Sequence, residues 1–364
     1  MPASAPEADG PSEAPSAESY LRRAPKVELH VHLEGAVRPQ RLLAVLQRHG
    51  LHTHLRRPED VAWLFHHDSF VDFLEHFRFV VTSLRDVQDV HDVARDLFEE
   101  LAAQQVLYAE VLFSAAIFVR LGMPWDELLA AVSEAEAAVL EPRRRGGSLP
   151  RYNLVLDLVR NFGPEFAAAQ VEEIAKRAHP RVVGVHLGGD EVNFPARLFA
   201  AAYARAGEAG LGRAAHAGEG AGAASVREAV EELQVTRIGH GIRCLEDPEL
   251  VHLLVERGIT LEVCPTSNVR TRVVSELQAH PLPLLLSQGL RCTIGSDDPS
   301  FFDTDLSREW IAAHRVLGLG LRQLDACADA GLEAAFLPQT EREVGLARLR
   351  AERAASRAEL GLTG

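Results

Sequence analysis

The sequence is poor in lysine, in paired cysteines and in long apolar runs, and each shortage narrows the kind of protein it can encode. Lys26 and Lys176 are the only lysines, and the formal net charge is −14, which argues against nucleic acid or an anionic membrane surface as a partner. The four cysteines are scattered without C-x-x-C spacing, so we expect reduced thiols in a cytoplasmic protein. No run of about 18 apolar residues is present, so we expect no membrane-spanning helix.

The first residues show no basic stretch followed by an apolar stretch, so we expect no secretory signal. Residues 1–24 are instead rich in Pro, Ala, Ser and Glu without apolar periodicity, which predicts a disordered tail. The whole chain has 364 residues, of which 47% are hydrophobic and 25% charged. This balance is typical of a globular protein with a large core.

Beyond the tail, short β-like runs alternate with longer amphipathic helical patterns. The eight runs with strand character are 27–31, 106–113, 152–159, 182–187, 213–216, 237–239, 260–264 and 292–295. Eight alternating units predict an α/β fold, a closed TIM-type (β/α)8 barrel over residues 25–349. A C-terminal helical tail is expected over 350–364. The connection 34–105 is too long for one crossover helix, so we expect extra helices over the C-terminal mouth of the barrel.

The pair His30 and His32 lies near the end of the first expected strand. Side chains alternate faces along a strand, so these two imidazoles project from the same face. Gly35 follows at once, which places the pair where the strand gives way to a loop. Two neighbouring imidazoles supply half of a metal site, although an isolated H-x-H pair is more often simply a polar face.

Other polar side chains follow later strands in the same way. They are His216 in His-Ala-Gly-Glu, His240 in Gly-His-Gly, and Asp297 and Asp298 in Ser-Asp-Asp-Pro. Taken singly, each has an ordinary interpretation as a loop histidine, a capped helix start or a turn. Active-site residues of β/α barrels gather at the C-terminal strand ends, however, and the joint pattern after strands one, five, six and eight favours a shared site.

Three imidazoles and one carboxylate, with a position left for water, suit a catalytic Zn²⁺. His30, His32, His216 and Asp297 supply that set. A second metal in such a barrel needs a bridging ligand, for which a carbamylated lysine is one known solution. Neither lysine is placed to serve, so the sequence predicts one zinc ion per chain.

The remaining strand-end groups fit the roles that a hydrolysis requires. A metal-bound water has its pKa lowered to about 7, and His240 is free to act as its base or to hold the resulting hydroxide in place. Glu219, three residues after His216, can deliver a proton as a general acid. Asp298 points away from its neighbour Asp297 and can hydrogen-bond to the substrate. These parts together describe a metal-assisted hydrolysis.

The motifs resemble the adenosine deaminase family of the amidohydrolase superfamily, and the resemblance runs from Pro25 to about Leu349. It is carried by the segments 26–35, 216–219, 237–241, 261–268 and 296–299. The resemblance implies the barrel already expected and hydrolytic loss of ammonia from C6 of a 6-aminopurine. It also implies zinc on the four residues named above, a proton from Glu219 to purine N1, and an orienting or activating role for His240 towards the hydroxide.

The same resemblance implies substrate contacts. Asp298 would bind purine N7, the backbone of Gly189 would bind N3, and Ser114 is placed among the substrate-binding residues as well. Phe73 and Phe77, with Phe70, match an apolar lid over the sugar side. Their i, i+3, i+7 spacing is equally typical of a helix core, and both interpretations stay open.

The choice of substrate depends on Glu34. Adenosine enzymes of the family usually carry Asp there, whereas Glu occurs in relatives that act on free adenine or on aminodeoxyfutalosine. We expect a small-molecule purine nucleoside as the substrate and water as the second reactant. Among substrates, we expect adenosine or a 5′-modified adenosine first, then aminodeoxyfutalosine specifically, then adenine.

Two alternative functions stay open: a different hydrolase with two metals, and a catalytically silent binding protein. The second would have lost Glu219 or His240, and neither is lost.

Overall fold

The structure, a computed structural model, describes residues 17–67, 70–144 and 149–362, with the side chains of residues 70 and 71 excepted. Eight parallel strands follow one another around a single sheet in sequence order. They are β1 (Lys26–His32), β2 (Val106–Phe113), β3 (Arg151–Asp157), β4 (Val182–His186), β5 (Gly212–Ala217), β6 (Arg237–His240), β7 (Thr260–Val263) and β8 (Arg291–Ile294). The predicted (β/α)8 barrel and all eight of its strands are confirmed.

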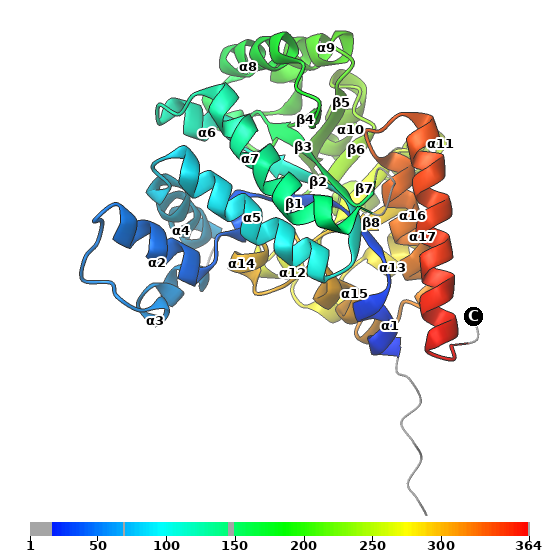
Figure 1. Cartoon of the computed structure of the whole chain (residues 1–364). Coiled ribbons are helices and arrows are strands. Elements are labelled where there is room, and N and C mark those ends of the chain that lie inside the picture. Colours follow the sequence, from blue (N-terminus) through cyan, green and yellow to red (C-terminus); the bar gives the residue numbers. More distant parts are fainter. Residues whose placement is uncertain (1–16, 68–69, 145–148, 363–364) are drawn as a thin grey trace, which may run out of the picture.

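Helices surround the strands, as Figure 1 shows. Up to β5 they are α1 (Ala17–Arg23), α2 (Pro39–Arg48), α3 (Pro58–Val61), α4 (Phe70–Ser83), α5 (Val87–Ala103), α6 (Ala115–Arg120), α7 (Trp125–Leu140), α8 (Pro164–Arg177) and α9 (Ala200–Glu208). After β5 they are α10 (Ala223–Glu232), α11 (Pro248–Glu256), α12 (Pro265–Arg270), α13 (Leu282–Ser287), α14 (Pro299–Phe302), α15 (Leu306–Arg315), α16 (Leu321–Ala334) and α17 (Gln339–Glu359). The long first connection carries α2 to α5, which confirms the extra helices.

The barrel closes where the end of β8 meets β1. Val31 and Asp297 form a parallel β-bridge. The backbone N–H of His32 donates to the carbonyl of Asp297 at 2.8 Å, and that of Asp297 donates to the carbonyl of His30 at 2.9 Å. The loop that carries Asp297 is thereby held against the histidine pair by main-chain hydrogen bonds, which are insensitive to side-chain identity.

The barrel interior holds buried charges as well as apolar packing. Arg237 on β6 lies between Glu110 of β2 and Glu262 of β7, with its Nε 2.7 Å from Glu262 Oε1, and all three side chains are fully buried. The guanidinium also lies 3.7 Å from the ring centre of Phe336. A buried carboxylate is tolerated only when it is paired, so this arginine compensates two charges at once.

The helices cross two of the predicted boundaries. The tail was expected to be disordered to residue 24, but Ala17–Arg23 form α1, because Tyr20 and Leu21 provide apolar side chains that are completely buried. The proposed break at residue 350 falls inside α17, whose Arg353 is buried and whose helix continues to Glu359. Residues 1–16 lie outside the described part of the chain.

The placement of Lys26 agrees with the argument for a single metal. It begins β1 at the opposite end from His32, and its Nζ donates to the carbonyls of Ala24 at 2.9 Å and Gln104 at 3.1 Å. It therefore cannot reach the strand ends where the histidines lie. Within the described residues, no helix is long and apolar enough to cross a membrane.

Replacing Arg237 with methionine should destabilise the barrel strongly. The change would leave Glu110 and Glu262 buried without their cation, and breaking such a pair costs about 3–5 kcal/mol. Urea denaturation of the variant measures this loss. Arg291→Met is the matched control, since Arg291 pairs with Glu333 at the surface and its loss should cost about 1 kcal/mol or less. Equal stability of the two variants would contradict the buried role of Arg237.

Candidate metal centre and active site

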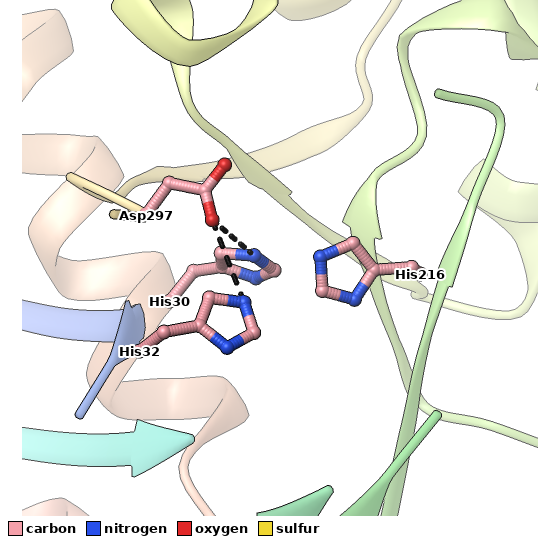
Figure 2. A group of neighbouring side chains, drawn as sticks. All are labelled: His30, His32, His216 and Asp297. Carbon is pink, nitrogen blue, oxygen red and sulfur yellow. Dashed lines mark ion pairs between the residues drawn. The ribbon is translucent and has the colours of Figure 1, made fainter. Parts of the chain in front are cut away.

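Four side chains from three separated segments meet at the C-terminal mouth of the barrel. His30 and His32 come from β1, His216 from β5, and Asp297 from the loop after β8. One ligand atom of each lies within 4.8 Å of the others. Asp297 Oδ1 is 3.6 Å from His30 Nε2 and 3.5 Å from His32 Nε2, and Figure 2 shows the ring of His216 facing this group from the other side. The set predicted from the sequence is thus brought together in space.

The donor set fits a divalent cation. His30 Nε2 is buried and has no hydrogen-bond partner within the described residues, although it points at the other three groups. Burial opposes protonation of His30, but Asp297 and Glu262 outweigh it and raise the pKa of its imidazole to about 10. His30, His240 and His32 in turn lower the pKa of the buried Asp297 carboxyl below its usual range. A positive charge between these groups is therefore favourable, and a bound metal ion would supply it.

A carboxylate behind His30 holds its ring in place. Glu262 Oε2 accepts from His30 Nδ1 at 2.8 Å, which leaves Nε2 as the nitrogen that faces the site. Outer partners of this kind fix the tautomer and orientation of ligating histidines. Gly239 makes room for the ring, because a Cβ there would lie 2.7 Å from His30 Cε1.

The partner behind His216 is another histidine. His186 ends β4, is fully buried, and places its Nδ1 3.3 Å from His216 Nδ1 and 3.9 Å from Asp157 Oδ1. If His216 binds a metal through Nε2, its Nδ1 carries the proton and His186 Nδ1 must accept it. An imidazole therefore stands where ligating histidines more often have a carboxylate or carbonyl.

Glu219 lies beside the four-residue group on a tightly held loop. Its Oε2 is 3.4 Å from His240 Nε2, and Thr271 Oγ1 donates to its Oε1 at 3.3 Å. Burial, with Asp297 and Glu191 nearby, raises the pKa of Glu219 to about 8. The carboxyl is therefore protonated at neutral pH, as a general acid must be.

The loop owes its shape to Glu191. One carboxylate oxygen accepts from the N–H of Gly218 at 2.6 Å, and the other from Glu219, Gly220 and Ala221 at 3.3, 2.8 and 3.0 Å. Four consecutive backbone donors thus converge on one side chain that is 7% exposed. Sequence reasoning missed Glu191, although it lies only two residues after Gly189, a predicted substrate contact.

His240 is held at the edge of the same group. Its Nε2 lies 3.8 Å from Asp297 Oδ2, and burial lowers its pKa to about 4, so the ring is neutral. His240 and Asp297 both have positive φ, 60° and 62°. Such left-handed backbone is costly for residues with side chains and concentrates at functional sites.

The predicted substrate contacts surround this centre. Asp298 Oδ1 and Glu34 Oε2 are buried without a hydrogen-bond partner in the described part of the chain, and burial raises the pKa of Glu34 to about 8. The N–H of Ser114 donates to Glu34 Oε1 at 2.8 Å. Gly189 has φ +98°, and a Cβ there would lie 2.4 Å from Asn161 Oδ1, so only glycine fits.

Phe73 and Phe77 pack on α14, the short helix that follows Asp298. Phe73 lies 5.3 Å from Phe302 and Phe77 lies 5.4 Å from Phe301, measured between ring centres. They are therefore packed side chains close to the site, and contact with a sugar stays a prediction. The side chain of Phe70 lies outside the described residues.

Fold and strand-end chemistry together define a metal-dependent hydrolase, and comparison with known proteins makes this specific. The sequence profile of the adenosine deaminase family matches residues 25–351, so the chain belongs to that family. It is a hydrolase acting on C–N bonds of cyclic amidines, a metal-dependent purine deaminase.

Three similar proteins illustrate the relationship. The aminodeoxyfutalosine deaminase of Acidothermus cellulolyticus is 40% identical over 324 residues, covering 87% of this chain and 88% of the relative. The adenine deaminase of Rhizobium etli is 36% identical, with 89% and 98% covered. The crystal structure of an amidohydrolase from Burkhoderia ambifaria, with bound Zn, has a TM-score of 0.85 at 26% identity, covering 98% of this chain and 97% of that chain.

Replacing Glu191 with glutamine should impair the loop of Glu219. The amide offers an N–H₂ where the backbone offers only donors, so hydrogen bonds to the loop are lost. A displacement of about 1 Å in a catalytic group can cost about 10²-fold in rate, and we expect a loss of that order at unchanged metal content. Steady-state kinetics and metal analysis measure both.

Asp190→Asn is the matched control for this variant. Asp190 is the preceding residue and accepts only from its own turn, at Val192 and Asn193. Its loss should leave the rate close to wild type. A Glu191→Gln enzyme as active as this control would show that the loop holds its shape without Glu191.

Proposed function

We propose that the chain catalyses hydrolytic deamination at C6 of a 6-aminopurine nucleoside, releasing ammonia, with one zinc ion per chain held by His30, His32, His216 and Asp297. The observation that carries the proposal is the meeting of this donor set with a half-buried acid, Glu219, at one mouth of the barrel. A divalent ion bound there lowers the pKa of a water molecule to about 7 and so supplies a nucleophile at neutral pH.

Glu219 acts as the acid of the reaction. Its protonated carboxyl donates to N1 of the purine while the water oxygen bonds to C6. Protonation of N1 makes C6 more electrophilic and so assists the attack. The two protons of the attacking water then go to the departing amine and back to Glu219. The C6–N6 bond breaks, ammonia leaves, and the 6-oxo product protonated at N1 remains. The raised pKa of Glu219 suits this role, because the acid must hold its proton at neutral pH.

Asp298 and Gly189 orient the purine. Burial and the neighbouring Asp297 raise the pKa of Asp298 well above its usual range, which favours the protonated carboxyl that can donate to N7, an acceptor. The backbone N–H of Gly189 is the proposed donor to N3. Two donors at opposite edges of the ring place C6 at the metal centre.

Glu34 is the proposed determinant of the sugar end. Its side chain is one methylene longer than that of aspartate, is 1% exposed, and accepts a hydrogen bond from the N–H of Ser114. It would crowd a free 5′-hydroxyl. The 40% identity to an aminodeoxyfutalosine deaminase supports a 5′-modified adenosine of that type as the substrate, ahead of adenosine itself. Free adenine is the second candidate, supported by the adenine deaminases among the relatives.

A panel of substrates tests the proposal. Zinc-loaded enzyme is offered aminodeoxyfutalosine, methylthioadenosine, adenosine and adenine, and both the change in purine absorbance and ammonia release are followed. We expect the highest kcat/KM for a 5′-modified adenosine. Highest activity on adenine would favour the second candidate, and no turnover of any 6-aminopurine would overturn the proposal.

Glu219→Gln is the control for the chemistry. The amide keeps the shape of the side chain but cannot release a proton, so we expect a loss of about 10²–10⁴-fold with zinc retained. Retained activity would remove Glu219 from the role of acid.

A further inference from the structure

A line of buried hydrogen bonds approaches His240 from behind. The N–H of Leu282, at the start of α13, lies 3.1 Å from His280 Nδ1. His280 Nε2 lies 3.1 Å from Asn268 Oδ1, and Asn268 Nδ2 lies 3.1 Å from His240 Nδ1. Asn268 and His240 are fully buried and His280 is 4% exposed, so water does not compete for these bonds.

The donor and acceptor of every hydrogen bond in this line follow from the first bond, which the backbone N–H of Leu282 donates. A backbone N–H can only donate, so His280 Nδ1 must accept, and neutral His280 then carries its proton on Nε2. Burial lowers the pKa of His280 to about 4, which keeps it neutral. The Nε2–H donates to the amide oxygen of Asn268. The amide nitrogen of Asn268 therefore faces His240 as a donor, and a flipped amide would place two donors against each other.

We propose that Asn268 and His280 are positioning residues that hold neutral His240 with its proton on Nε2. His240 then meets the attacking oxygen as a hydrogen-bond donor, not as a base. The proposal rests on the proposed function, because the attacking oxygen belongs to that reaction. Of the two roles that the sequence allows for His240, base or holder of the hydroxide, a donor Nε2–H fits only the second.

The surroundings of His240 Nε2 agree with a donor. The atom is buried and has no hydrogen-bond partner in the described residues, and the groups nearest to it are Glu219 Oε2 at 3.4 Å and Asp297 Oδ2 at 3.8 Å. Asp297 is an ionised carboxylate, and its oxygen would repel a lone pair on that nitrogen but attracts an N–H. Glu219, once it has given its proton to N1, can accept a proton from the attacking water, while His240 keeps its own proton throughout.

The substitution Asn268→Asp tests the proposal in the full-length, zinc-loaded enzyme. Aspartate has nearly the same shape and still accepts from His280, but it presents an oxygen to His240 Nδ1. The proton of His240 is then drawn to Nδ1, and the donor towards the site is lost. Removing one such donor typically costs about 10²–10³-fold in kcat, and we expect a loss of that order with KM and zinc content unchanged.

The position of the proton is measured separately from activity. Long-range proton–nitrogen spectra of the ¹⁵N-histidine-labelled protein distinguish the two tautomers, and the His240→Gln variant assigns the signal. We expect Nε2–H in the wild type and a proton on Nδ1 in Asn268→Asp. Nδ1–H in the wild type would overturn the proposal whatever the substrate proves to be. Failure of the substrate panel alone would overturn only the function.

Two substitutions of His280 keep the test decisive if Asn268→Asp does not fold. Gln places a donor nitrogen where His280 has Nε2, so His280→Gln should keep kcat close to wild type. His280→Leu removes the donor and frees the amide of Asn268 to turn, and loss of an outer partner of this kind costs about 10–100-fold. Equal kcat for these two variants, at equal thermal stability, would overturn the proposal.

Discussion

The site depends on the pair of main-chain hydrogen bonds that joins the end of β8 to β1. These bonds close the barrel, and they also place Asp297 between His30 and His32, with its Oδ1 within 3.6 Å of both histidine Nε2 atoms. Residues that are about 265 positions apart in the sequence become neighbours because a parallel barrel must end beside the strand with which it began. Closing the ring therefore also brings three of the four proposed ligands together.

Buried groups behind the site orient its histidines. Glu262 supports His30, Arg237 compensates Glu262, and Glu110 shares the arginine. His186 stands behind His216 and Asn268 behind His240. The imidazoles of His30, His216 and His240 therefore each have one nitrogen held by a buried partner, and their other nitrogens are directed to the same small volume. Preorganisation of this kind means that little rearrangement is needed when the substrate binds.

The strand pattern and the rule of strand ends were sufficient to predict the barrel and the residues His30, His32, His216, Glu219, His240 and Asp297. Both signals are local, because alternation and polar strand ends can be read from a few residues. The residues that support the site from behind could not be predicted from local patterns. Glu191 and His280 act through contacts that depend on how the loops fold. Asp157 and His186 also end strands, β3 and β4, so an even application of the same rule would have found them. The helix α1 was missed because its burial depends on distant helices, such as α16, whose Asp325 accepts from Tyr20.

The most direct test is anomalous diffraction at the zinc absorption edge on crystals of the zinc-loaded protein. We expect a single peak per chain, surrounded by His30, His32, His216 and Asp297. A peak elsewhere, or a second peak that takes His186 or Glu262 as a ligand, would contradict a one-metal centre built from those four side chains.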